Sequence, residues 1–414
     1  MPNLARRATE IRPSPTIAMN ARAAELKRMG RDVIPFSLGE PDFHTPDNIK
    51  AAGVAAIDRN FTKYTNADGF PLLKEAIVGK LLRDNEAQYS ADQIAVGSGA
   101  KVVILAAVLS IVNPGDEVVI PTPYWVSYPD LVELAGGKPV FAACEESTGF
   151  TLTPDTLASV MTSRTRAIIF NSPNNPSGAV YTKEQIRALV PVLKRHPDVW
   201  VVTDELYEHI VFDGRKTATF VQAVPEFSDR IITINGFSKG YVMTGWRLAF
   251  AAGPRSVIKS IGDLLSSMTG SANSIAQAAA IEAIKGDQAF MERNRKTFQE
   301  RRDLVVRRVN TIPGLSCAAP AGTFYVYVNC GGWLGRTSRG GRDLKSDIDV
   351  VEAILNEADV ATVPGQVFGA SPFFRISISL EAPVILKGMD RIATFADGLR
   401  TAAAQPVGDS RRLD

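Results

Sequence analysis

The sequence has few of the features that mark disulfide-rich or metal-binding proteins. It contains three cysteines and three histidines in 414 residues, and Cys144, Cys317 and Cys330 lie far apart. Their odd number and wide spacing argue against a disulfide framework, and the lack of a CxxC or Cys/His cluster argues against a structural zinc site. We therefore expect no metal, and cysteines that fill small apolar spaces in a reducing compartment.

Long hydrophobic runs and an excess of one charge are also missing. The longest apolar run, residues 102–112, is interrupted by Ser110 and is too short to cross a bilayer. No apolar segment follows the N-terminal arginines, so this end does not resemble a signal peptide. A formal net charge of +2 does not favour nucleic acid or a membrane surface as partner. We expect a cytoplasmic protein.

The middle of the chain alternates short apolar runs with helical stretches such as 183–195 and 256–267. The runs are almost continuously apolar, which indicates strands buried on both faces of a sheet. They lie at residues 93–96, 117–121, 139–143, 167–171, 199–203, 231–234 and 248–252. The pattern predicts an α/β fold with a mostly parallel seven-stranded sheet in an α/β/α sandwich.

The last third of the chain differs in organisation. An arginine-rich helix is expected at 291–309, followed by a small α+β region with strands near 324–329 and 374–379. Residues 331–346 are rich in Gly, Arg and Ser and are expected to form a mobile surface loop. The first residues show no helix–strand alternation and are expected to join this region. The predicted units are an N-terminal arm that is part of the small domain (1–49), a large domain (50–295) and a small C-terminal domain (296–414).

Reactive side chains follow two neighbouring apolar strands at their carboxyl ends. Asp204 and Tyr207 follow one strand, Lys239 follows the next in a turn of small residues, and Arg247 comes eight positions later. Open α/β folds bind ligands at this edge of the sheet. A lysine for a Schiff base, an acid for a pyridinium nitrogen and cationic groups for a phosphate together suit pyridoxal phosphate.

Each of these residues also has a simpler explanation. Asp204 would suit a helix cap, Lys239 a solvated loop and Arg247 a surface ion pair. Their combination favours the cofactor, because a desolvated lysine near other cations has a lowered pKa and becomes a nucleophile. Ser238 and Arg247 fit a phosphate site.

Further positions fit the same ligand. Gly99, Ala100 and Lys101 lie between a strand and an apolar helix, where backbone N–H groups would face an anion. The segment matches neither the Walker A pattern nor G-x-G-x-x-G. Trp125 would either stack on the pyridine ring or pack in the core. Asn175 would either bind the phenolate oxygen or simply form part of a turn.

Arg375 is set into an otherwise apolar strand. Because a buried unpaired charge is costly, we expect this guanidinium to bind a carboxylate ligand through two hydrogen bonds. A structural salt bridge is the alternative.

These motifs resemble the pyridoxal-phosphate-dependent class I/II aminotransferases of fold type I, and among them the bacterial aspartate aminotransferases that include aspartate/prephenate enzymes. The resemblance covers nearly the whole chain. It rests on GEPDF (39–43), KYT (63–65), PYWVSYP (123–129), NSPNNPSG (171–178), DELYEH (204–209), SK (238–239) and MTGWR (243–247).

The resemblance implies which residues bind the cofactor in the large domain. Lys239 would form the Schiff base and then move the proton at the substrate Cα, while Asp204 would pair with the ring nitrogen. The other implied cofactor contacts are Tyr207 and Asn175 at the phenolate oxygen, Trp125 on the ring, and Ser238, Arg247, Gly99, Ala100 and Lys101 at the phosphate. Tyr64 would reach the phosphate of a neighbouring subunit, which implies a homodimer.

The resemblance also implies substrate contacts. Arg375 would hold the α-carboxylate near the backbone of Gly39, with Trp125 and Asn175 beside it. Lys101 aligns with a lysine that contacts the distal carboxylate in aspartate-specific relatives. Arg12 stands where prephenate-using relatives place a basic residue.

The implied reaction is a ping-pong transfer of an amino group from an L-amino acid, aspartate or another acidic donor, to a 2-oxo acid such as 2-oxoglutarate. The alternatives are an aminotransferase with aromatic, aliphatic or prephenate specificity, and a lyase or decarboxylase that uses the same cofactor and fold. A cofactor-sensing transcription regulator would need a DNA-binding module, which we do not expect here. Departures from the family pattern, such as Leu38, Val102 and Ile378, lie around the substrate rather than the cofactor.

Overall fold

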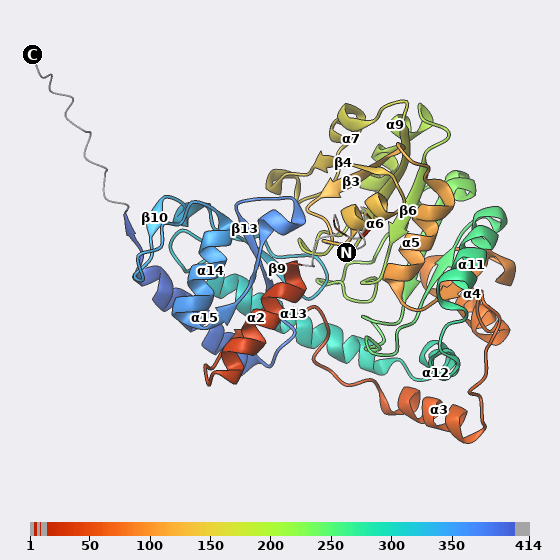
Figure 1. The fold of residues 1–414 in the computed structure, drawn as a ribbon, viewed down its shortest axis with the longest axis horizontal. Coiled ribbons are helices and arrows are strands. Elements are labelled where there is room, and N and C mark those ends of the chain that lie inside the picture. Colours follow the sequence, from red (N-terminus) through yellow and green to blue (C-terminus); the bar gives the residue numbers. More distant parts are fainter. Residues whose placement is uncertain (1–3, 6–8, 10–14, 402–414) are drawn as a thin grey trace, which may run out of the picture.

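The computed structural model of the chain describes residues 4–5, 9 and 15–401. Its largest element is a seven-stranded sheet with the strand order β2-β8-β7-β6-β5-β3-β4 (Figure 1). Strand β8 runs in the direction opposite to that of the other six strands. The strands are β2 Ile94–Gly97, β3 Glu117–Thr122, β4 Lys138–Ala143, β5 Thr165–Asn171, β6 Trp200–Asp204, β7 Ile231–Gly236 and β8 Ala249–Ala252. The predicted seven-stranded, mostly parallel sheet is therefore confirmed.

Helices cover both faces of this sheet, as its continuously apolar strands require. Ile169 and Val202 pack toward one layer, whereas Phe170 and Val201 pack toward the other. The first layer contains α5 Ala100–Ile111, α6 Tyr128–Leu134 and α11 Arg255–Thr269. The second contains α3 Asp47–Asp58, α4 Pro71–Asn85, α7 Pro154–Val160, α8 Lys183–Ala188, α9 Val190–Lys194, α10 Phe220–Ala223 and α12 Ser274–Lys285. The result is the expected α/β/α sandwich.

The helix predicted at 183–195 is two helices. α8 ends at Ala188 and α9 begins at Val190, one residue before Pro191. Proline has no backbone N–H and clashes with the preceding turn, so it begins a helix more readily than it continues one.

A smaller region packs beside the large sheet (Figure 1). Its antiparallel sheet has the order β12-β13-β9, and β1 pairs in parallel with β11. Its strands are β1 Ile34–Pro35, β9 Tyr325–Asn329, β10 Arg336–Thr337, β11 Val360–Ala361, β12 Val363–Pro364, β13 Phe373–Ser377 and β14 Arg400–Thr401. Its helices are α2 Pro15–Arg28, α13 Ala289–Val309, α14 Asp347–Ala358 and α15 Ala382–Asp397. The N-terminal segment from α2 to β1 thus packs against the C-terminal region.

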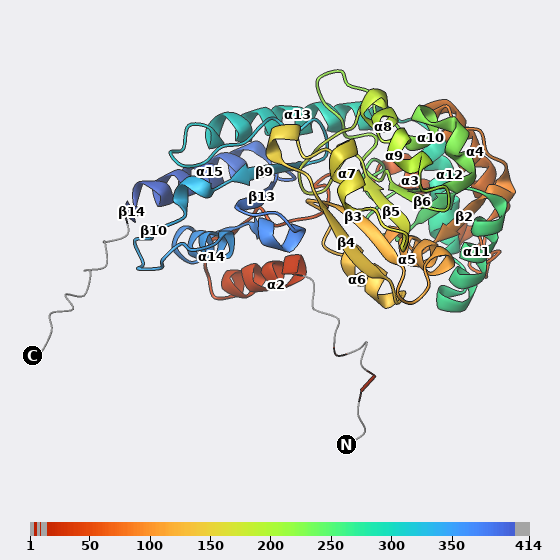
Figure 2. The same cartoon turned by 90° about the horizontal axis from the view of Figure 1, so that it is seen from above.

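Figure 2 shows α13 running along the small region toward the large sheet. The helix passes without a break through the boundary expected at residue 295, and the limits 1–49, 50–295 and 296–414 stay a prediction. Within the segment expected to be a surface loop, 331–346, the side chains of Trp333 and Leu344 are buried. The indole of Trp333 donates a 2.8 Å hydrogen bond to the carbonyl of Pro313.

Over the ranges that the structure describes, no helix is long and apolar enough to cross a membrane, and no three metal-binding side chains gather. Cys144, Cys317 and Cys330 are buried and unpaired.

The parallel register brings the polar ends of three strands together. Asn171 of β5 pairs with Asp204 of β6, which in turn pairs with Ile234 of β7. The chain leaves β7 at Gly236 and reaches Lys239 three residues later.

A buried ion pair anchors the loop that follows β6. The ammonium of Lys80 in α4 donates to Glu208, and Asn85 and Asn235 donate to the same carboxylate at 2.7 and 2.8 Å. Burial favours the protonated carboxyl, but Lys80 and His209 hold the pKa of Glu208 well below its usual value. Since Glu208 directly follows Tyr207, this cluster fixes a loop at the edge of the sheet.

Replacing Lys80 with methionine should lower the free energy of unfolding by about 3–5 kcal/mol, because an unpaired carboxylate stays buried. Urea unfolding, followed by circular dichroism, measures this loss. Lys259→Met, which breaks a 2.7 Å ion pair with Asp263 on the exposed face of α11, is the matched control and should be nearly neutral. Equal stability of the two variants would contradict the role of Lys80.

Candidate active site

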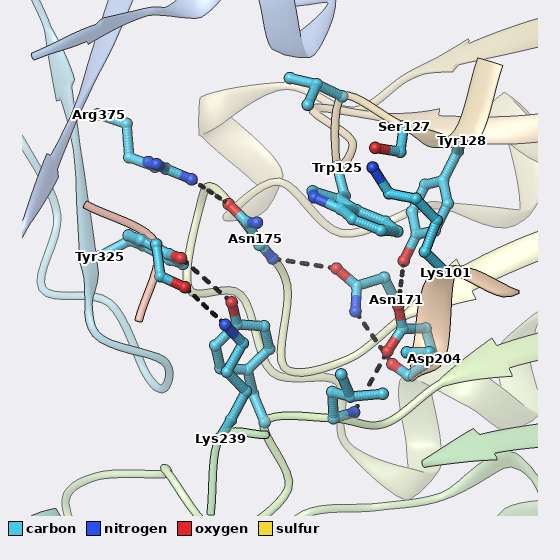
Figure 3. A pocket seen from close by; sticks show the side chains of 15 residues that line it. Lys101, Trp125, Ser127, Tyr128, Asn171, Asn175, Asp204, Lys239, Tyr325 and Arg375 are labelled. Carbon is cyan, nitrogen blue, oxygen red and sulfur yellow. Dashed lines mark hydrogen bonds between the residues drawn. The ribbon is translucent and has the colours of Figure 1, made fainter. Parts of the chain in front are cut away.

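A cavity lies at the carboxyl edge of the large sheet, where the small region faces it (Figure 3). Nine predicted site residues line it: Gly39, Ala100, Lys101, Trp125, Asn175, Asp204, Tyr207, Lys239 and Arg375. They come from strand ends, helix starts and the small region, so the fold brings together residues that are distant in the sequence.

The side chain of Lys239 is half-buried in this cavity, and its amine donates a 2.6 Å hydrogen bond to the carbonyl of Gly39. Burial lowers the pKa of Lys239 to about 8; Glu40 opposes this decrease, while Arg375 and Arg247 add to it. More of this amine is therefore neutral near physiological pH than in an ordinary lysine, and the neutral amine is the form that acts as a nucleophile.

Asp204 is buried on the other side of the cavity and is held by several donors. The hydroxyl of Tyr128 donates to Oδ2 at 2.6 Å and the backbone N–H of Leu206 donates to Oδ1 at 3.2 Å. The amide of Asn171 donates to the Asp204 carbonyl at 3.0 Å. Burial raises the pKa of Asp204, while the donors from Tyr128 and Leu206 act against the increase. A carboxylate in this position can accept a hydrogen bond from a cationic ring nitrogen.

A cationic corner lies next to the cavity at the N-terminus of α5. Gly99 caps this helix with a φ of +95°, and a Cβ there would lie only 2.5 Å from Nη2 of Arg247. Glycine therefore lets the guanidinium approach the free N–H groups of the helix, which attract anions. Ser238 is buried beside Lys239. Ser238, Gly99 and Arg247 adjoin the cavity without lining it.

Arg375 is buried in β13 and faces the cavity. Its Nη1 donates to Oδ1 of Asn175 at 2.8 Å, its Nη2 donates to the carbonyl of Ser37 at 3.2 Å, and its Nε has no partner. The guanidinium lies 4.1 Å from the ring centre of Tyr325. Among the described residues no carboxylate pairs with Arg375, so the structural salt bridge is excluded there and the prediction of a carboxylate ligand fits.

Three predicted site residues differ in position from the others. Lys101 lies at the rim with its ammonium 5.3 Å from the ring centre of Trp125, and burial lowers its pKa while Asp130 opposes the decrease. Tyr64 is 94% exposed and does not line the cavity. Arg12 lies outside the described residues.

The sequence predictions missed six lining residues: Val126, Ser127, Tyr128, Asn171, Leu206 and Tyr325. Tyr128 belongs to the same short motif as Trp125, and Asn171 ends a strand beside Asp204, so both had a local signal. Tyr325 had none. Its hydroxyl lies 3.2 Å from that of Tyr207, and this contact depends on how the small region packs.

Comparison with known sequences shows the family to which this chain belongs. The family model described as aminotransferase class I and II matches residues 31–392. An aspartate/prephenate aminotransferase of Cereibacter sphaeroides is 50% identical over 389 residues, which cover 94% of this chain and 97% of the relative. An aspartate aminotransferase of Rhizobium meliloti is 46% identical over 395 residues, which cover 95% and 96%. The chain belongs to the class I and II aminotransferases.

Solved structures of this family share the fold. The aspartate aminotransferase of Rhizobium meliloti superposes with a TM-score of 0.94 at 46% identity, covering 97% of this chain and all of that one. The aspartate aminotransferase of Thermus thermophilus with maleate gives a TM-score of 0.89 at 36% identity, covering 95% of this chain and all of that one. The protein is thus an aminotransferase, whose substrates are an amino acid and an oxo acid.

Class I and II aminotransferases use pyridoxal phosphate, and the cavity fits this cofactor. An amine with a lowered pKa and a buried carboxylate line the same cavity, and a cationic corner lies at a helix N-terminus. The unpartnered Nε of Arg375 leaves a buried donor for a further anionic group.

The amine of Lys239 should react as a nucleophile at unusually low pH. In the cofactor-free protein, reductive methylation with formaldehyde and cyanoborohydride should rise with pH around a midpoint of about 8, because the neutral amine becomes abundant there. Peptide mass spectrometry follows the modification of each lysine. Ordinary exposed lysines have a pKa of about 10.4, and the same midpoint for Lys239 would contradict the desolvated amine.

Proposed function

We propose that this aminotransferase binds pyridoxal phosphate and moves the amino group of aspartate to a 2-oxo acid such as 2-oxoglutarate in two half-reactions. The observation that carries the proposal is the Lys239 amine with its lowered pKa, set in one cavity with Asp204 and Arg375. A nucleophile, an acid for the ring nitrogen and a carboxylate clamp are the groups that transamination needs.

The chain's own residues hold the cofactor. Asp204 would accept a hydrogen bond from the ring nitrogen, and Trp125 would stack on the ring. Tyr207 and Asn175 would donate to the phenolate oxygen; the amide oxygen of Asn175 is already taken by Arg375, so its NH₂ group remains to donate. Ser238, Arg247 and the N–H groups of Gly99, Ala100 and Lys101 would bind the phosphate. When bound, the cofactor supplies an electron sink for the negative charge that develops at the substrate Cα.

Lys239 carries the proton that is transferred. With the cofactor bound, the free amine of Lys239 would take the proton from the substrate Cα and hold it. Its lowered pKa suits this role, since an acid–base group works best when its pKa lies near the working pH.

Arg375 and Lys101 select the substrate. Arg375 binds the α-carboxylate beside the backbone of Gly39, and Lys101, at the rim beside Trp125, binds the distal carboxylate of aspartate. The names of the relatives support this choice, as does the Thermus thermophilus structure with maleate, which also carries two carboxylates.

Prephenate is a second candidate substrate. The relative with 50% identity is an aspartate/prephenate aminotransferase, and Arg12 stands where a basic residue would serve prephenate. A lyase or a transcription regulator has no comparable support among the relatives.

We further propose a cytoplasmic homodimer in which Tyr64 contacts the phosphate of the neighbouring subunit. A tyrosine that is 94% exposed, together with the exposed Val54 and Ile57 on α3, supports a contact surface there.

Lys239→Ala should lower kcat with aspartate and 2-oxoglutarate by at least about 10³-fold, because both the covalent attachment and the proton carrier are lost. A coupled assay for oxaloacetate measures the rate. Lys259→Ala on the surface of α11 serves as the control and should match the parent enzyme. Undiminished turnover by Lys239→Ala would refute the assignment.

Lys101→Met should lower kcat/KM for aspartate by about tenfold or more, the loss expected for one charge-assisted hydrogen bond. Donors without a distal carboxylate, such as alanine, should be unaffected and provide the internal control. An equal loss of kcat/KM for alanine and aspartate would show that Lys101 does not bind the distal carboxylate.

A further inference from the structure

Tyr128 lines the cavity, and the reaction described above gives it no role. It is the first residue of α6, its side chain is 1% exposed, and its hydroxyl donates to Oδ2 of Asp204 at 2.6 Å (Figure 3). A buried tyrosine hydroxyl needs a hydrogen-bond partner. Because a buried carboxylate carries a large desolvation cost, its use as this partner at the centre of a ligand site calls for an explanation.

The hydroxyl is held in place by the segment that supplies the stacking residue. The backbone N–H of Tyr128 donates to the carbonyl of Trp125 at 3.0 Å, and the two rings meet edge to face at 5.4 Å. A cofactor ring stacked on Trp125 would therefore have a fixed position relative to the pair formed by Tyr128 and Asp204.

The direction of this hydrogen bond has a chemical consequence. A donor to a carboxylate stabilises its charged form. Burial favours the protonated form of Asp204, and the Tyr128 hydroxyl is the main group acting against it. Burial and the neighbouring Asp204 also raise the pKa of Tyr128 well above its usual value, so the hydroxyl keeps its proton and remains a donor.

We propose that Tyr128 is a positioning residue that keeps Asp204 ionised and so holds the shared proton on the ring nitrogen of the cofactor. Without this donor the proton moves along the same hydrogen bond from nitrogen to carboxylate, which leaves a neutral acid facing a neutral ring. The ring then withdraws charge from the substrate Cα less effectively. The inference rests on the proposed function, because it requires the bound cofactor with its nitrogen at Asp204.

The direct test is nitrogen-15 NMR of the enzyme loaded with pyridoxal phosphate labelled in the ring. The parent enzyme should show a protonated ring nitrogen, and Tyr128→Phe, which removes one oxygen atom, should shift the signal toward the unprotonated position. The matched control is Tyr181→Phe, which removes a buried hydroxyl that bonds Leu152 instead. An unchanged signal in Tyr128→Phe overturns the inference, whereas an unprotonated nitrogen in the parent enzyme overturns the proposed role of Asp204.

A second measurement separates this role from a purely structural one. Tyr128→Phe should weaken binding of pyridoxal phosphate by about tenfold, the effect of one hydrogen bond to a charged group. It should change little the binding of an analogue with carbon in place of the ring nitrogen. Equal weakening for both ligands would mean that Tyr128 only supports the fold and would overturn the inference.

Kinetics give a third readout. Tyr128→Phe should lower kcat by about tenfold with KM for aspartate nearly unchanged, since the interaction acts on charge that develops during the reaction. A rise in KM with an unchanged kcat would instead place Tyr128 in substrate binding and contradict the proposal.

Discussion

The parallel pairing of β5, β6 and β7 is the constraint on which the site depends. Because parallel strands end at the same edge of a sheet, Asn171, Asp204 and the turn with Lys239 converge although they belong to separate stretches of sequence. A slip of one residue in β6 would turn the Asp204 side chain to the other face of the sheet. The helices on both faces prevent such a slip, since β5, β6 and β7 fill the core on both sides.

The second constraint is electrostatic. Lys239, Arg247 and Arg375 lie in or beside one cavity, and the mutual repulsion of these cations adds to the effect of burial on the Lys239 amine. Such a site is unfavourable when empty and favours ligands that bring phosphate and carboxylate groups. The same arrangement that makes the lysine reactive therefore also selects an anionic cofactor and substrate.

Much of this architecture follows from local patterns. Continuous apolar runs predict the seven strands, and Asp204 and Lys239 are recognisable because they follow such runs directly. The break between α8 and α9 was missed although Pro191 signals it, and the buried Trp333 lies in a stretch whose composition suggests only a loop. The contact of Tyr325 with Tyr207 depends on the packing of the small region against the large sheet, which no local pattern encodes.

The central claim is that the amine of Lys239 carries the cofactor. Its most direct test is to reduce the holoenzyme with borohydride, digest it, and locate the pyridoxyl group by mass spectrometry. The account predicts one modified peptide, which contains Lys239. A pyridoxyl group on another lysine, or none on a protein that nevertheless transaminates, would contradict it.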